Sequence, residues 1–64
     1  DRETEEVVKS VLEVMPEDLA GLLRAYYLED KSYKVIAATE GMSSGALKMK
    51  LFRARKVFKK FLTS

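Results

Sequence analysis

The sequence predicts an all-α fold, namely a compact four-helix domain that contains a C-terminal helix-turn-helix. Apolar residues recur at helical spacing along nearly all of the 64 residues, and no alternating strand pattern interrupts them. The breaks between the apolar stripes are short, so neighbouring helices have to fold back on one another. Charge is also divided sharply along the chain, which sets the last helix apart from the others.

The first two helices are separated at Met15-Pro16. The first apolar stripe comprises Val7, Val8, Val11 and Leu12. Pro16 suits the first turn of a second helix, because its missing N–H would have no partner there. Glu17 and Asp18 follow at positions where the helix dipole favours anions. The second apolar stripe comprises Leu19, Leu22, Leu23 and Tyr26.

A short third helix is predicted over about residues 32–40, with a signal at each end. Ser32 is a good N-cap, and Gly41 ends the helix because glycine adopts the left-handed conformation without a Cβ clash. The apolar residues of this helix are Val35, Ile36 and Ala37. Met42 is an apolar turn residue, and Ser43 or Ser44 caps a fourth helix that runs to about Leu62. A short helix, a glycine turn and a longer helix form the helix-turn-helix plan.

The fourth helix carries most of the positive charge. Residues 41–64 contain seven basic residues and no acidic one, whereas residues 1–40 contain five basic and ten acidic residues. Basic residues without an acid at i±4 repel one another, so a solvated surface explains this arrangement poorly. A face that binds a long, regular anion explains it better, and nucleic acid is such an anion.

Helical phase divides the fourth helix into two faces. The predicted core face comprises Leu47, Leu51, Ala54, Phe58, Phe61 and Leu62. The opposite face comprises Gly45, Met49, Phe52, Arg53, Lys56 and Lys60, and Lys48, Arg55 and Lys59 flank it. Met49 and Phe52 leave two interpretations open. Either the helix lies deeper than predicted and both belong to the core, or both contact thymine methyl groups and base edges in a major groove.

Composition argues against several other classes of function. The chain has no cysteine and no histidine, so it lacks disulfides, zinc–thiolate sites and the usual general base. Acidic pairs such as Glu5-Glu6 point about 100° apart on a helix and do not form a catalytic dyad. We therefore expect no enzyme activity, no cofactor, no metal site and no small-molecule substrate. No apolar run approaches the roughly 20 residues that span a bilayer, so we expect no membrane partner.

Three stretches of the sequence form a recognisable series. They are Ser32-Tyr33-Lys34-Val35-Ile36-Ala37, Gly41-Met42-Ser43-Ser44-Gly45-Ala46-Leu47-Lys48 and Leu51-Phe52-Arg53-Ala54-Arg55-Lys56. Together they resemble region 4 of bacterial sigma factors, and among these the extracytoplasmic-function (ECF) group. The resemblance covers about residues 12–60 and is most specific from Gly45 to Lys56. Because the chain begins at Asp1 rather than at Met, we expect residues 1–64 to be one region 4-like domain of a longer protein.

The resemblance implies a promoter-recognition module of the bacterial cytoplasm. Such a module binds the minus-35 element as double-stranded promoter DNA through its fourth helix. It also docks on the RNA polymerase core, at the flap of the β subunit, and thereby directs transcription initiation. Anti-sigma factors commonly mask these surfaces, so an anti-sigma factor is an expected partner.

The resemblance also implies which residues contact DNA. Bases or adjacent phosphates would be reached by Lys48, Met49, Phe52 and Arg53, with Lys56 on the same face. The helix N-terminus would be brought to a phosphate by Ser43, Ser44, Gly45 and Ala46. The DNA backbone would also lie beside Tyr33 and Lys34. Two departures from the family pattern are Tyr26, where arginine is common, and Asp30, where glycine is usual.

Two alternatives remain open from the sequence. One is a quorum-sensing (LuxR-type) regulator DNA-binding domain with the same four-helix plan, against which Arg53-Ala54-Arg55 argues. The other is a sigma-like protein-interaction module that binds only an anti-sigma factor. Loss of DNA affinity with retained anti-sigma binding would distinguish that module from a promoter-recognition domain.

Overall fold

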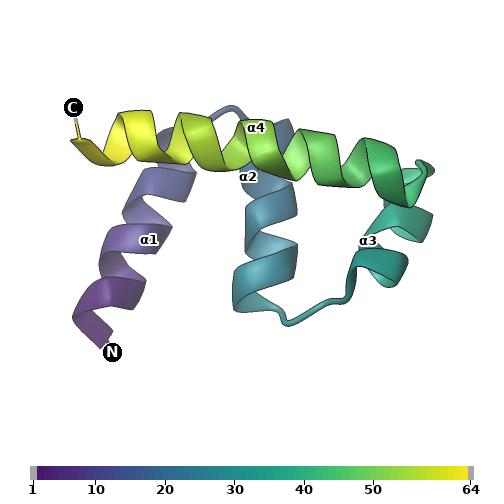
Figure 1. Cartoon of the computed structure of the whole chain (residues 1–64). Coiled ribbons are helices and arrows are strands. Elements are labelled where there is room, and N and C mark those ends of the chain that lie inside the picture. Colours follow the sequence, from purple (N-terminus) through teal and green to yellow (C-terminus); the bar gives the residue numbers. More distant parts are fainter. Residues whose placement is uncertain (1, 64) are drawn as a thin grey trace.

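In the computed structural model, which describes residues 2–63, the chain folds into four α-helices and one π-helical segment. The helices are α1 (Arg2–Val14), α2 (Glu17–Leu23), α3 (Tyr33–Glu40) and α4 (Ser44–Thr63), and the π-helical segment η1 (Arg24–Leu28) continues α2. The longest helix, α4, crosses the molecule, and the other three pack along one side of it (Figure 1). The predicted all-α fold is confirmed. None of the helices in the described part of the chain is long and apolar enough to cross a membrane.

The core is aliphatic and lies against the middle of α4. Its members are Val11, Leu12, Met15, Leu19, Ala20, Leu22, Leu23, Ile36, Ala37, Leu47, Leu51 and Ala54. Every helix contributes to this cluster, and the largest completely buried side chains are Leu22, Leu47 and Leu51. No polar or charged side chain is buried between residues 2 and 63. The fold therefore depends on hydrophobic burial, which contributes about 1.5–3 kcal/mol per large aliphatic side chain before the entropy cost of folding.

The predicted apolar stripes include residues near the ends of two helices that are exposed in the structure. Phe61 and Leu62 were predicted to be core, but they are 41% and 47% exposed, because the last turn of α4 extends beyond the helices that cover it (Figure 1). Val7 is exposed because the N-terminal half of α1 projects away from α4 (Figure 1). Val35 is also exposed, so α3 buries only Ile36 and Ala37. Helical phase alone cannot reveal where the covering helices end.

The break between α1 and α2 is better packed than the sequence indicates. Met15, which only interrupts the predicted stripe, is buried in the core. Its N–H donates a hydrogen bond of 3.2 Å to the carbonyl oxygen of Val11 and so continues the backbone pattern of α1. Pro16 occupies the N-cap of α2, and its carbonyl oxygen accepts bonds from the N–H groups of Leu19 and Ala20. The turn thus provides hydrogen-bond partners for backbone groups at the ends of both helices, and it adds the Met15 side chain to the core.

The chain leaves α2 through a widened turn that ends at a backbone position of positive φ. In η1 the N–H of Glu29 bonds the carbonyl oxygen of Arg24 at 3.0 Å, one residue beyond the α-helical partner. Asp30 follows with φ of 54°, in the left-handed region that L-residues with a Cβ avoid. The structure thus explains why glycine suits this position.

Replacing Asp30 by glycine is expected to raise the free energy of unfolding by about 0.5–1 kcal/mol. The substitution relieves the left-handed strain, and the added freedom of the unfolded chain offsets part of that gain. Thermal unfolding followed by circular dichroism measures the change. Asp18→Gly is the control, because the same exchange in the first turn of α2 is expected to lower the melting temperature. Equal destabilisation by both substitutions would contradict the strain at Asp30.

Candidate nucleic-acid interface

Hydrogen bonds at three caps define the start of α3, its end and the start of α4. The side-chain oxygen of Ser32 accepts a bond of 3.2 Å from the N–H of Val35, which confirms its predicted N-cap role. Gly41 has φ of 66°, and the N–H of Met42 reaches the carbonyl oxygen of Ala37 at 3.0 Å. This is the Schellman pattern, in which a left-handed glycine closes the last helical turn. Both ends of α3 are therefore set by local sequence.

Ser43, rather than Ser44, caps α4. Its side-chain oxygen accepts a bond of 3.1 Å from the N–H of Ala46, and its carbonyl oxygen accepts a bond of 2.9 Å from the N–H of Leu47. Gly45 has open space around it, since a Cβ at this position would meet nothing within 4 Å. Packing within the domain therefore does not require a glycine at this position.

The structure excludes the interpretation that Met49 and Phe52 belong to the core. These side chains are 65% and 56% exposed, whereas Leu47, Leu51 and Ala54 on the other face are completely buried. The two large apolar residues thus stand on the solvent side of α4. Lys56 lies next to them, with its Nζ 5.1 Å from the centre of the Phe52 ring. A cation over an aromatic face restrains both side chains and keeps an apolar surface beside a positive charge.

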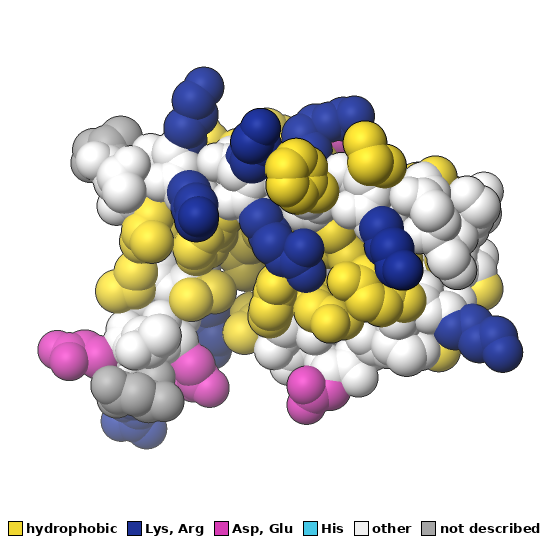
Figure 2. Space-filling view, viewed as in Figure 1, with side chains coloured by type: hydrophobic (Ala, Val, Ile, Leu, Met, Phe, Trp, Pro, Cys, Tyr) yellow, Lys and Arg dark blue, Asp and Glu magenta, His cyan; other side chains and the backbone are white. Residues whose placement is uncertain are grey.

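The structure brings the predicted contact residues together on and around α4. The exposed ones are Lys34, Ser43, Ser44, Gly45, Ala46, Lys48, Met49, Phe52, Arg53 and Lys56, and Tyr33 is half-buried. Lys34 and Tyr33 come from the first turn of α3, and the rest come from α4 and the residue before it. Figure 2 shows Lys and Arg side chains spread along α4, while most of the visible Asp and Glu side chains lie at the lower edge, away from it. Positive side chains and exposed apolar side chains are therefore interspersed along α4.

Sequence reasoning missed a cluster of three tyrosines around Arg55. The Nε of Arg55 donates a hydrogen bond of 2.7 Å to the hydroxyl of Tyr27, and its guanidinium carbon lies 5.7 Å and 6.0 Å from the ring centres of Tyr27 and Tyr26. The Tyr26 ring in turn lies 5.0 Å from that of Tyr33. The partners of the hydrogen bond are 28 residues apart. Because no spacing rule links residues so distant, no signal in the single sequence could have found them.

Arg55 and its neighbours shift the pKa values of two of these tyrosines. Hydrogen bonding to the Arg55 guanidinium lowers the pKa of Tyr33, and the charge of Lys48 lowers it further. The pKa of Tyr26 is raised, chiefly because its hydroxyl interacts with that of Tyr33. The Tyr33 hydroxyl thus lies in a positive environment that favours negative charge.

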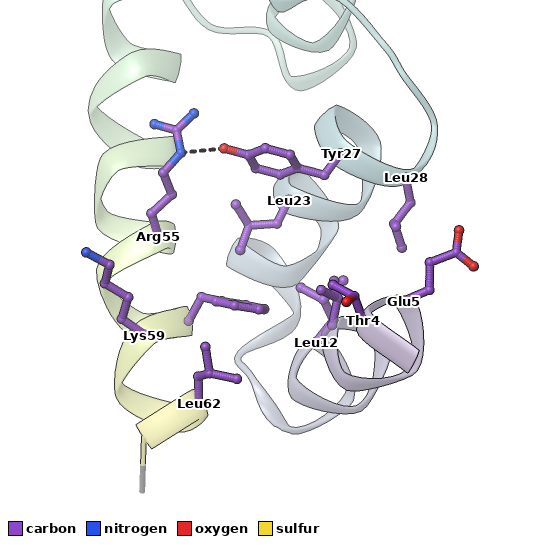
Figure 3. Close-up of a pocket in the computed structure, with 11 residues that line it drawn as sticks. Thr4, Glu5, Leu12, Leu23, Tyr27, Leu28, Arg55, Lys59 and Leu62 are labelled. Atoms are coloured by element: carbon purple, nitrogen blue, oxygen red, sulfur yellow. Dashed lines mark hydrogen bonds between the residues drawn. The ribbon is translucent and has the colours of Figure 1, made fainter. Parts of the chain in front are cut away.

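A groove of about 530 Å³ opens beside this cluster, between α1, η1 and the C-terminal half of α4 (Figure 3). Its walls are mostly apolar and include Val8, Leu12, Leu23, Leu28, Phe58 and Leu62. Arg55 and Lys59 line it from α4, and Glu5 lines it from α1 (Figure 3). A groove of this composition suits an amphipathic helix from a partner protein.

Comparison with known protein families matched residues 5–57 to the family described as Sigma-70, region 4. The chain belongs to the sigma-70 region 4 family. Neither curated proteins nor solved structures gave a match. Region 4 is a DNA-binding helix-turn-helix domain of sigma factors, which recognise promoters and interact with RNA polymerase in transcription. It is a regulatory family and not a family of enzymes.

The family assignment also decides between two readings of the sequence. A LuxR-type regulator domain shares the four-helix plan, but the matched span identifies this one as a region 4 domain. The match includes α2, η1 and α3 completely and α4 as far as Val57. The capped turn and the exposed basic face of α4 are therefore features of a promoter-recognition domain.

Proposed function

We propose that residues 1–64 form the minus-35 recognition domain of an ECF-type sigma factor, and that α4 binds the element as duplex DNA through the major groove. The exposed face of α4 carries this proposal, because Lys48 and Arg53 flank an uncovered apolar pair, Met49 and Phe52. Cations bind phosphates and guanine edges, and apolar side chains fit thymine methyl groups. The stretch Leu51–Lys56 supports the ECF type.

The other predicted contacts support the same orientation. With α4 in the groove, its N-terminal residues, from Ser43 to Ala46, would lie close to a phosphate, where the positive end of the helix dipole is favourable. Tyr33 and Lys34 at the start of α3 lie where the first helix of the motif crosses the backbone. Base reading is thus assigned to the first turns of α4, and affinity to the cations around them.

The proposal is tested by selection from a library of random 20-base-pair duplexes, using the 64-residue chain at low salt. A shared motif is expected among the recovered duplexes. Fluorescence anisotropy should show preference for the selected duplex over a shuffled one, and the logarithm of the binding constant should fall steeply with the logarithm of salt concentration. If no motif is recovered and the chain still binds an anti-sigma factor, the domain is a protein-interaction module instead.

The apolar groove between α1 and α4 supports a docking site for the RNA polymerase β flap. Phe58 and Leu62 offer apolar surface at the α4 wall, and Arg55 and Lys59 offer positive charge beside it. An amphipathic helix with acidic residues along one edge would match both features. An anti-sigma factor that occupies this groove or covers α4 would prevent transcription initiation.

Leu62→Glu is expected to weaken binding of the flap segment to the chain at least about tenfold, because it places a charge in an apolar contact. Val14→Glu is the matched control, since Val14 is exposed on α1 and does not line the groove. Isothermal titration calorimetry with the isolated flap segment measures both. Equal affinities of the two variants would place the docking site elsewhere.

A further inference from the structure

Arg55 differs from the other cations of α4 in being held by aromatic side chains. Its guanidinium lies near the rings of Tyr26 and Tyr27, and its Nε is bonded to the Tyr27 hydroxyl. A phenol is neutral, so this anchoring fixes the group without cancelling its charge. Figure 3 shows the two terminal nitrogens of Arg55 pointing away from the groove. The guanidinium therefore presents oriented donors and a full positive charge.

The position of Arg55 on α4 places these donors beside the proposed DNA-binding face. Seven residues separate it from Lys48, which puts the two about 20° apart around the helix, and Phe52 lies about 60° away. A duplex that receives Met49 and Phe52 in its major groove would have one backbone wall along this flank. Arg55 is thus positioned for a phosphate, not for a base edge.

Tyr33 extends the aromatic cluster that holds Arg55, because its ring centre lies 5.0 Å from that of Tyr26. Hydrogen bonding to Arg55 is the main cause that lowers the pKa of Tyr33, and the charge of Lys48 lowers it to a smaller extent. Tyr33 begins α3, whereas its two cationic neighbours come from α4, and Tyr27 belongs to η1. Residues of η1 and α4 therefore meet at Arg55, beside Tyr33 of α3, and the Arg55 guanidinium supplies charged N–H donors. Charge-assisted hydrogen bonds from such donors are the usual means of binding a phosphate.

We propose that Arg55 binds one backbone phosphate of the duplex, and that Tyr27 is a positioning residue that holds the Arg55 fork. This inference rests on the proposed DNA-binding function. It adds Arg55 as a DNA contact and gives the tyrosine cluster a role in binding, beyond connecting η1 to α4.

The test uses the selected duplex in versions that each carry one methylphosphonate linkage, which removes the charge of a single phosphate. Arg55→Gln is expected to weaken binding to the unmodified duplex about tenfold. It should also reduce by about one the salt slope, which is the slope of the logarithm of the binding constant against the logarithm of salt concentration. At one linkage, the methylphosphonate should lower the affinity of wild type, whereas Arg55→Gln should bind the modified and the unmodified duplex equally. Lys9→Gln removes the same charge from α1, outside the proposed interface, and should behave like wild type at every linkage.

Tyr27→Phe distinguishes the positioning of the Arg55 guanidinium from the effect of its charge. It keeps the ring and the Arg55 charge but removes the hydroxyl that accepts the Nε bond, so affinity should fall about threefold with an unchanged salt slope. Its sensitivity to the critical methylphosphonate should also decrease. Thermal melts of each variant confirm that the chain is folded at the assay temperature. If Arg55→Gln is unfolded, Arg55→Lys replaces it and should lose affinity at an unchanged salt slope, because it keeps the charge and loses the fork.

The failure of this inference differs from the failure of the proposed function. If wild type binds the selected duplex and Arg53→Ala weakens binding, but the Arg55 variant matches Lys9→Gln at every linkage, Arg55 is purely structural and the inference is wrong. An Arg55 variant that loses thermal stability but no affinity leads to the same conclusion. If wild type binds no duplex, the proposed function and the inference both fail.

Discussion

Leu51→Ala is expected to lower the free energy of unfolding by about 2–5 kcal/mol, because it removes a completely buried side chain and leaves a cavity in the core. Domains below about 70–80 residues rarely have more than about 3–5 kcal/mol of stability from a single core. The variant should therefore be largely unfolded at 25 °C. Urea unfolding followed by circular dichroism at 222 nm gives the measurement.

Phe52→Ala provides the matched control for this substitution. Phe52 is the next residue along α4 and is larger than leucine, but it is more than half exposed. Its replacement should change the free energy of unfolding by no more than about 0.5 kcal/mol, as is usual for surface positions. If the two variants were equally stable, α4 would be rotated from the orientation described here.

Arg53→Ala is expected to weaken binding to the selected duplex by about 1–3 kcal/mol and to relax the preference at one base pair. Arg53 is exposed on the same side of α4 as Met49 and Phe52, and its planar fork can form two hydrogen bonds with guanine. Binding to the shuffled duplex should fall much less. Anisotropy titrations against both duplexes measure the difference.

Lys59→Ala is the comparison for a contact that carries no base information. Lys59 is exposed six residues further along α4, so it should weaken binding to both duplexes nearly equally. Its salt slope should fall by about one. Equal losses on the selected and shuffled duplexes for Arg53→Ala would assign Arg53 to the phosphates and remove it from base reading.

Those parts of the fold that depend on local chemistry could be predicted from the sequence. Ser32 and Gly41 act at the two ends of α3 as predicted, because N-caps and left-handed glycines depend on only a few neighbouring residues. Helical phase likewise identified Leu47, Leu51 and Ala54 as core. Each of these rules uses residues within about one or two turns of each other.

Features that depend on distant packing could not be predicted in this way. Phe61 and Leu62 fit the apolar phase of α4, but both are more than two-fifths exposed. The hydrogen bond from Arg55 to Tyr27 joins residues that are remote in sequence. Met49 and Phe52 could be placed on one face from the sequence, yet only the assembled fold showed that this face is exposed. The contacts assigned to DNA stay predictions until they are measured.

The separation of charge between α4 and the rest of the molecule gives the domain an electric dipole moment. The acidic residues all precede Gly41, and most of those visible in Figure 2 lie away from the basic helix. In the field of a polyanion such a molecule experiences a torque, so it turns its cationic side inward before any contact forms. Encounters would then begin in a nearly productive orientation, and raising the ionic strength should slow association more than it speeds dissociation.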